Sequence, residues 1–404
     1  MYRISETSEV RDRRYEFIIL DDASINAFAA PGGIIGINTG MFIKTETEGQ
    51  FASVMCHELA HLSQRHYARS QQNNNPLTNA LILLGSVATA VVTANPQAIL
   101  IAPALIQQLA TNYTRENERE ADRIGFRNLV NAGFDPRSQS QMFQILQKSQ
   151  SGINEEYSYL FTHPIPKERI TDARIREENI DNQSNYRNSL EFYLVKARAE
   201  VANSKNFNSL KEFYLSKRKN NDNKIKLYKK YGLSLVLKEQ KKYEESFKAA
   251  RELLKETPSN LIFQTNILEI HLAEGNSLEA ISIGERLLNV NSNNFSISYY
   301  LAKAYILDNN PEKAEEILIN LSKENPRDPT VWYELAEAQG LAGNIIGLHR
   351  SRAEYFILTG RYDSAIFQLR EGLKLSKNFF EIRESIINKL EQIYKTKRAL
   401  KDLT

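Results

Sequence analysis

The C-terminal half of the chain repeats with a period of 34 residues, which restricts the possible folds more than any other feature. Small residues recur at Ser246, Ala280 and Ala314, each at the end of a polar segment such as 243–246. A unit of this length cannot bury an apolar face alone, so it must stack on its neighbours, and small residues let two helices cross closely. We therefore predict an all-α solenoid.

Further positions share this phase. Pro258 and Pro326 each lie 12 residues beyond a small residue, where a unit would close, and Ala302 and Tyr305 fit packing positions of a first helix. The period and these positions resemble tetratricopeptide repeats. We assign an all-α tetratricopeptide solenoid to residues 190–404.

The phase is expected to change near the C-terminus. After Trp332 the small residues Ala353 and Ala365 indicate a unit that begins early, so one helix at about 345–358 would serve two repeats. Residues 379–403 are charged and amphipathic, which predicts a capping helix.

Residues 1–185 have a different sequence pattern, with strand-like as well as helix-like segments. Segments 15–20 and 33–38 are rich in β-branched and aromatic residues, and a Pro-Gly-Gly sequence at 31–33 separates them. This pattern predicts strands joined by a turn. From Glu46 onward the periodicity is helical, so the region is expected to form an α+β domain.

Segment 56–61, Cys-His-Glu-Leu-Ala-His, places two histidines four positions apart on a helical stretch. His57 and His61 therefore share one helix face and can reach one zinc ion. Glu58 would project near the open position of the metal, where it can take a proton from the attacking water and deliver it to the leaving amine. The single cysteine, Cys56, excludes a thiolate cluster. The alternative is a solvated helix face with two incidental histidines.

A catalytic zinc site needs a third protein ligand and one open position. A metzincin would supply a histidine at position 67, which is Tyr67 here. The best candidate is Glu118, because Asp122 lies on the same helix face and can accept the ring N–H of a ligating histidine. Glu116 and Glu120 are expected to face solvent.

Taken together, the motifs of residues 15–175 resemble the M48 peptidases. This resemblance implies an α+β zincin-like metallopeptidase domain of gluzincin type over 1–185, with one Zn²⁺ held by His57, His61 and Glu118. The matching segments are 26–33 (Asn-Ala-Phe-Ala-Ala-Pro-Gly-Gly), 39–40 (Thr-Gly), 57–61, 118–122 (Glu-Arg-Glu-Ala-Asp) with Gly125, 132–136 (Ala-Gly-Phe-Asp-Pro) and 162–164 (Thr-His-Pro) with Arg169.

The resemblance also implies a substrate strand. Asn26, Ala27, Phe28 and Ala29 precede the turn at 31–33, and in the family such a strand borders the cleft and pairs with an extended substrate backbone. Only the His-Glu-x-x-His motif is generic, whereas this segment and the Glu-x-x-x-Asp segment are specific to the family.

Two more residues are catalytic candidates. His163 could reach the open metal position as a fourth ligand and produce a self-inhibited state, or it could hydrogen-bond a transition-state oxyanion; the alternative is a plain loop histidine. Arg169 could orient a substrate carbonyl or a carboxylate, and the alternative is a simple salt bridge.

No charged residue lies between Arg69 and Arg115. Within this gap, residues 80–106 form two apolar stretches, each shorter than the roughly 20 residues that a membrane-spanning helix needs. These stretches could form a buried helical hairpin, or a lid or peripheral membrane contact near the active site. A third interpretation is a true membrane span.

The order of domains resembles a periplasmic branch of the M48 family that acts as protease and chaperone-like factor in outer-membrane protein assembly. We expect an endopeptidase whose repeats bind polypeptide clients or the assembly machinery. Residues 1–6 lack the features of a signal peptide, so we expect a true start upstream and a periplasmic protein; the alternative is cytoplasmic. The net charge of +3 gives no reason to expect nucleic acid.

Two rival functions remain. One is a chaperone or adaptor whose zinc domain is latent or structural, although Glu58 would serve no purpose in a structural site. The other is a membrane-embedded CAAX-type protease, which would need several spans, and the sequence offers no apolar run of about 18 residues.

Overall fold

The computed structural model describes residues 2–30, 32–66, 69, 115–149, 159, 163–180, 186–216 and 222–401. The chain folds into two compact units, one of Met1–Asn206 with Arg218–Tyr228 and the other of Phe207–Lys217 with Lys229–Thr404. Helix α11 (Leu190–Ala202), which the sequence pattern places with the repeats, lies in the first unit. The boundary between 185 and 190 stays a prediction.

The first unit contains a three-stranded sheet in the order β1-β3-β2. Strands β1 (Glu16–Leu20) and β3 (Ile34–Asn38) are parallel, and β2 (Ala27–Ala30) pairs antiparallel with β3. The turn at Gly32 and Gly33 joins β2 to β3, whereas the two strands predicted at its ends are β1 and β3, which pair in parallel. These glycines have φ of +91° and +81°, values that favour glycine. Within the described sheet, β2 is therefore an edge strand.

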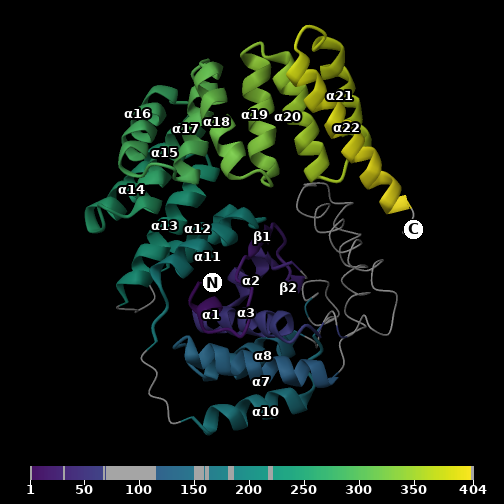
Figure 1. The fold of residues 1–404 in the computed structure, drawn as a ribbon. Helices are drawn as coiled ribbons and strands as arrows, with labels where there is room; N and C mark the ends of the chain where they lie inside the picture. Colours follow the sequence, from purple (N-terminus) through teal and green to yellow (C-terminus); the bar gives the residue numbers. More distant parts are fainter. Residues whose placement is uncertain are drawn as a thin grey trace. The chain divides into compact units, whose positions relative to one another are not determined.

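Helices cover the sheet and form the rest of the first unit (Figure 1). The central helix, α3 (Glu48–Ser63), begins with a capping box in which Thr47 accepts from Gln50 N and the Gln50 side chain accepts from the Thr47 backbone. It packs against β2, α7 and α8. Besides α11, the other helices described in this unit are α1 (Tyr2–Glu6), α2 (Thr39–Lys44), α7 (Arg115–Asn131), α8 (Arg137–Ser149) and α10 (Lys167–Glu178).

Helices α3 and α7 approach each other closely at Gly125. A Cβ atom there would lie 3.0 Å from His57 N and 3.1 Å from Cys56 O, both of which are backbone atoms. Cys56 itself is fully buried in the apolar core. The glycine therefore sets the distance between the two helices that carry the candidate ligands.

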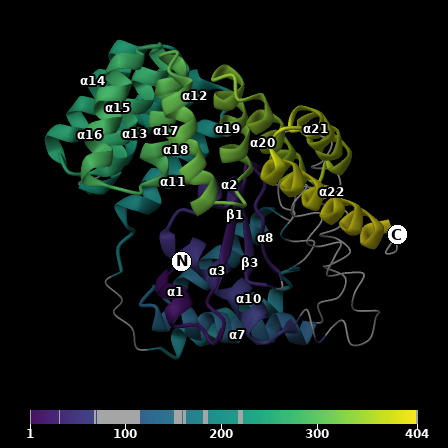
Figure 2. The ribbon, with the colours of Figure 1, turned by 45° about the horizontal axis from the view of Figure 1, so that its top comes forward.

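The second unit is an array of antiparallel helices that lie side by side in chain order (Figure 2). Helices begin at Tyr243, Ser277, Pro311 and Ile345, which keeps the 34-residue spacing, and the small residues Ser246, Ala280 and Ala314 are fully buried. The predicted solenoid is confirmed. Its helices are α12 (Phe207–Leu215), α13 (Asn223–Glu239), α14 (Tyr243–Glu256), α15 (Leu261–Glu274), α16 (Ser277–Val290), α17 (Phe295–Leu307), α18 (Pro311–Glu324), α19 (Pro329–Leu341), α20 (Ile345–Leu358), α21 (Tyr362–Leu375) and α22 (Phe380–Lys401).

The predicted change of phase after Trp332 agrees with the structure. Helix α20 packs against both α19 and α21. The turn after α20, in which Arg361 N donates to Phe356 O, is of the kind that follows α17 and α19, where Asn310 N donates to Tyr305 O and Asn344 N donates to Gln339 O. Helix α20 thus follows α19 as a second helix and precedes α21 as a first helix, and Ala353 and Ala365 are both buried. The capping helix is observed as α22.

No helix in the described ranges is both long and apolar enough to cross a bilayer. The apolar segment 80–106, for which a hairpin or a membrane contact was predicted, lies outside the described residues.

Candidate metal centre

Helix α3 carries the two histidines and the glutamate of the motif. His57 and His61 are one turn apart on the same face, and Glu58 lies beside them. All three side chains are buried, with 2–3% of their surface exposed. A solvated helix face is therefore excluded for this segment.

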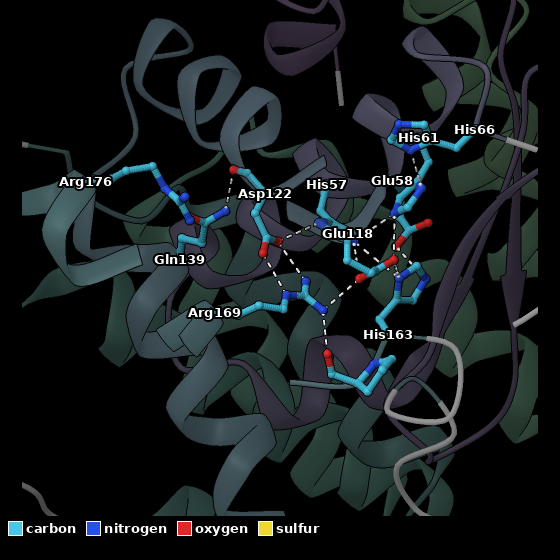
Figure 3. Close-up of polar contacts among 11 residues, drawn as sticks. His57, Glu58, His61, His66, Glu118, Asp122, Gln139, His163, Arg169 and Arg176 are labelled. Atoms are coloured by element: carbon cyan, nitrogen blue, oxygen red, sulfur yellow. Dashed lines mark hydrogen bonds and ion pairs between the residues drawn. The ribbon is translucent and has the colours of Figure 1, made fainter. Parts of the chain in front are cut away.

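Two further groups converge on these histidines (Figure 3). Glu118 comes from α7, and His163 comes from the segment before α10. The possible ligand atoms of His57, His61, Glu118 and His163 all lie within 4.8 Å of one another. The structure thus brings together all three predicted ligands and the predicted fourth group.

The spacing of these atoms fits a small tetrahedral cation. His57 Nε2 lies 3.0 Å from His61 Nε2, 3.3 Å from His163 Nδ1 and 3.4 Å from Glu118 Oε2. Glu118 Oε1 lies 3.2 Å from His61 Nε2 and 2.9 Å from His163 Nδ1. Ligand bonds of 2.0–2.1 Å to zinc would separate tetrahedral ligands by about 3.3–3.4 Å. Imidazole and carboxylate are also ligand types that zinc accepts.

Asp122 and Arg169 contact the candidate ligands from outside the cluster. Asp122 Oδ1 lies 3.0 Å from His57 Nδ1, the ring atom that faces away from the cluster, as predicted for its role. Arg169 donates from Nε and Nη2 to the two carboxylate oxygens of Asp122, both at 2.7 Å, and its Nη1 lies 2.7 Å from Glu118 Oε2. Arg169 thus adopts the salt-bridge alternative raised from the sequence.

Charge and burial compete in this cluster. Burial lowers the pKa of His57, but the carboxylates of Glu118 and Asp122 outweigh burial and raise that pKa to about 10. Burial raises the pKa of Asp122, but Arg169 and His57 outweigh it and lower the value to about 2. For His61 burial dominates and lowers the pKa to about 3, which leaves a neutral ring.

Glu58 has the surroundings of a proton-transfer group. Its Oε1 atom is buried without a hydrogen-bond partner, and His163 Nε2 lies 3.6 Å from it. Burial raises the pKa of this carboxyl, and the histidines and the hydroxyl of Tyr159 oppose the increase. Sequence reasoning missed Tyr159, whose ring stacks on His163 at 4.6 Å between centroids. No motif pointed to it.

His66 and Glu120 were also missed. The sequence assigned no role to His66, but this residue is fully buried between His61 and Glu120. Glu120 was expected to face solvent, and its side chain is partly exposed, but it also contacts His66 and Arg69. The one available signal was a third histidine close behind the motif.

The predicted substrate strand borders this region. Strand β2 packs against α3, and in the described sheet no strand pairs with its edge opposite β3. Asn26 and Ala27 are buried, whereas Phe28 and Ala29 are half-buried. The structure places all four on or beside the edge strand; a substrate contact stays a prediction.

These features define the class of the protein: a buried His-Glu-x-x-His helix with a third carboxylate ligand is the arrangement of a metallopeptidase. Comparison with known families agrees. The model of "Peptidase family M48" matches residues 1–177, and a model of "Tetratricopeptide repeat" matches residues 271–339.

Similar proteins match most of the chain or its first part. The chain is 33% identical over 361 residues to the beta-barrel assembly-enhancing protease of Escherichia coli (strain K12), covering 87% of this chain and 73% of that protein. The protein of the same name from Yersinia pestis is 31% identical, covering 89% and 74%. The mitochondrial metalloendopeptidase OMA1 of Schizosaccharomyces pombe is 27% identical over 44% of this chain and 53% of its own. The chain belongs to peptidase family M48.

Proposed function

We propose that this protein is a zinc-dependent endopeptidase that cleaves misfolded or stalled client proteins in periplasmic quality control and outer-membrane protein assembly. The observation that carries this proposal is the convergence of His57, His61 and Glu118 beside the buried, unpartnered oxygen of Glu58. Members of family M48 are metallopeptidases, and we propose Zn²⁺, one per chain, as the metal of this one.

His57, His61 and Glu118 are proposed as the zinc ligands. A bound zinc ion would polarise the scissile carbonyl and increase the acidity of water. Glu58 accepts a proton from the attacking water and returns it to the leaving amine, for which its position between the ligands and its raised pKa are suited. Asp122 orients His57, and Arg169 acts in catalysis by holding both Asp122 and Glu118 in place.

A latent form is the second candidate, and His163 is the observation that favours it. Its Nδ1 atom lies among the ligand atoms, 2.9 Å from Glu118 Oε1. Four protein ligands are typical of a closed zinc site, whereas a catalytic site keeps one position open. We propose that His163 occupies this position at rest and leaves it when substrate binds, where it could then stabilise the oxyanion. If it never leaves, the protein is a chaperone or adaptor.

Substrate recognition is proposed at two places. An extended polypeptide would pair with the edge of β2 at Asn26, Ala27, Phe28 and Ala29, because an edge strand presents unpaired backbone groups. The repeats would bind clients or the outer-membrane assembly machinery and raise the local concentration of substrate. The relatives' name, beta-barrel assembly-enhancing protease, supports this partner class.

We propose a periplasmic location, with a cytoplasmic one as the alternative. Bacterial β-barrels are outer-membrane proteins, so a protease that acts on their assembly would work beside that membrane. A peripheral membrane contact through 80–106 is part of the same proposal.

Casein cleavage by purified protein, with metal content measured by mass spectrometry, tests the proposal. We expect one zinc per chain in wild type and in Glu58→Gln, and loss of cleavage in the variant. Glu118→Gln should lose zinc, whereas Glu116→Gln, an exposed carboxylate on the same helix, is the matched control and should change neither property. Cleavage retained by Glu58→Gln would refute the mechanism.

His163→Ala separates the active from the latent form. Faster cleavage by this variant, with zinc still bound, would establish self-inhibition. Bound zinc with no cleavage in either wild type or His163→Ala would favour the chaperone.

A further inference from the structure

We propose that His66 positions the ligand His61 by accepting a hydrogen bond from its ring, and that Glu120 holds His66 in the required tautomer. This inference rests on the proposed function, because it explains how one zinc ligand is oriented. The three side chains form one continuous line from α7 to the metal centre, in which Glu120 contacts His66 and His66 contacts the proposed ligand His61.

The positions of the ring protons follow from the distances. His61 Nε2 faces the ligand set, 3.0 Å from His57 Nε2, so it must offer a lone pair to a metal and its proton must reside on Nδ1. His61 Nδ1 lies 3.0 Å from His66 Nδ1, which must therefore accept, and the proton of His66 resides on its Nε2. That atom lies 2.9 Å from Glu120 Oε2, and an ionised carboxylate can only accept.

A further group secures the far end of this line. Arg69 Nη1 donates to the same oxygen of Glu120 at 3.2 Å. Glu120 is half-exposed on α7, whereas His66 is fully buried. The carboxylate therefore connects a buried ring to the surface, where its charge remains solvated.

The backbone is shaped to bring His66 to this place. Residues five positions apart on a regular helix point about 140° away from each other, so His66 could not reach His61 if α3 continued. The helix ends at Ser63, and Arg65 has a φ of +53°, in the left-handed region that non-glycine residues rarely adopt. This conformation turns the chain back, with Arg65 N donating to Leu62 O at 3.1 Å. Unfavourable backbone of this kind persists where surrounding contacts require it.

The two histidine ligands are thus supported differently. His57 faces the carboxylate of Asp122 directly, at 3.0 Å from Nδ1 to Oδ1. The corresponding atom of His61, Nδ1, is connected to the carboxylate of Glu120 through the ring of His66. Removing such a partner of a metal ligand typically lowers metal affinity by about 10–100-fold, because the ligand ring loses its fixed orientation and tautomer.

The test measures metal affinity rather than turnover. Full-length protein is stripped with a chelator and titrated with Zn²⁺ against a chromophoric competitor, and the visible absorption of the Co²⁺ form reports ligand geometry. We expect His66→Leu to bind zinc about 10–100-fold more weakly and to alter the Co²⁺ spectrum. His66→Asn should recover most of the affinity, because its amide oxygen can accept in place of Nδ1.

Controls keep the test decisive if His66→Leu fails to fold. Glu120→Ala removes the far end of the line at a half-exposed helical site and should weaken binding several-fold, whereas Glu116→Ala on the same helix should not. Arg65→Gly keeps the left-handed conformation without strain and should retain affinity. Wild-type affinity and spectrum in both His66→Leu and Glu120→Ala would overturn the inference. A wild-type protein that binds no zinc would refute the proposed function, and this inference with it.

Discussion

Replacement of Arg169 by methionine should destabilise the peptidase unit strongly. The guanidinium donates to both oxygens of Asp122 at 2.7 Å and lies 2.7 Å from Glu118, and 3% of the arginine is exposed. Methionine retains much of the stem that packs beside Phe143 but leaves two buried carboxylates without their cation. Breaking a buried ion pair by removing one partner costs about 3–5 kcal/mol in free energy of unfolding.

The loss of stability in Arg169→Met should depend on pH and should decrease in acid. Arg169 and His57 lower the pKa of Asp122 to about 2 against the effect of burial, compared with about 3.9 in an unfolded chain. A depressed carboxyl pKa contributes stability above the unfolded value, and that stability is lost as pH falls toward the folded value. The difference in free energy of unfolding between wild type and Arg169→Met should therefore be largest at neutral pH and should decrease between about pH 4 and pH 2.

The assay must separate the two units. The single tryptophan, Trp332, lies in the repeat unit, so its fluorescence during urea unfolding serves as an internal control. Hydrogen exchange of peptides from α3 and α7, with a chelator present, gives the opening free energy of the peptidase unit. Arg137→Met, which removes an exposed pair with Asp135, is the matched control and should have little effect. A loss below about 1 kcal/mol for Arg169→Met, the range of surface pairs, would refute the reasoning.

Three further outcomes are expected. Gly125→Ala, whose Cβ would lie 3.0 Å from His57 N, should push α3 and α7 apart and weaken zinc binding several-fold in competition titrations, while the free energy of unfolding falls by no more than about 2 kcal/mol. The acid limb of kcat/KM should lie above the ordinary glutamate range near 4.3, because burial raises the pKa of Glu58 and a general base must be ionised. Zinc binding to chelator-treated protein at pH 7 should release about one proton, measured by calorimetry in buffers of different ionisation enthalpy, because His57 has a pKa of about 10 before its ring becomes a ligand.

The parts of this molecule that depend on local pattern could be predicted from the sequence. Ser246, Ala280 and Ala314 share a period because each unit packs its helices in the same way, and all three residues are buried in the structure. His57 and His61 share a face because helix geometry fixes residues four apart. The small residues Ala353 and Ala365 likewise indicated the change of phase after Trp332, because they are packing residues of α20 and α21.

The missed residues depend on contacts that no local pattern encodes. His66 reaches its place through the left-handed conformation of Arg65, which propensity alone would not assign to an arginine. Glu120 shares a helix with three other carboxylates, and only the path of the chain after α3 selects it for His66. Tyr159 contributes through a stacking contact with His163 from a segment without a recognisable motif.

Charge balance explains why an arginine is buried behind a metal site. Glu118 and Asp122 bring two negative charges into a place from which water is excluded, and Arg169 supplies one positive charge to both. The remaining charge must come from a proton on His57 or from a divalent cation among the ligand atoms, since an uncompensated buried charge is costly. The position of Arg169 therefore agrees with the electrostatics of the ligand set, and the same deficit favours a cation over an empty cluster.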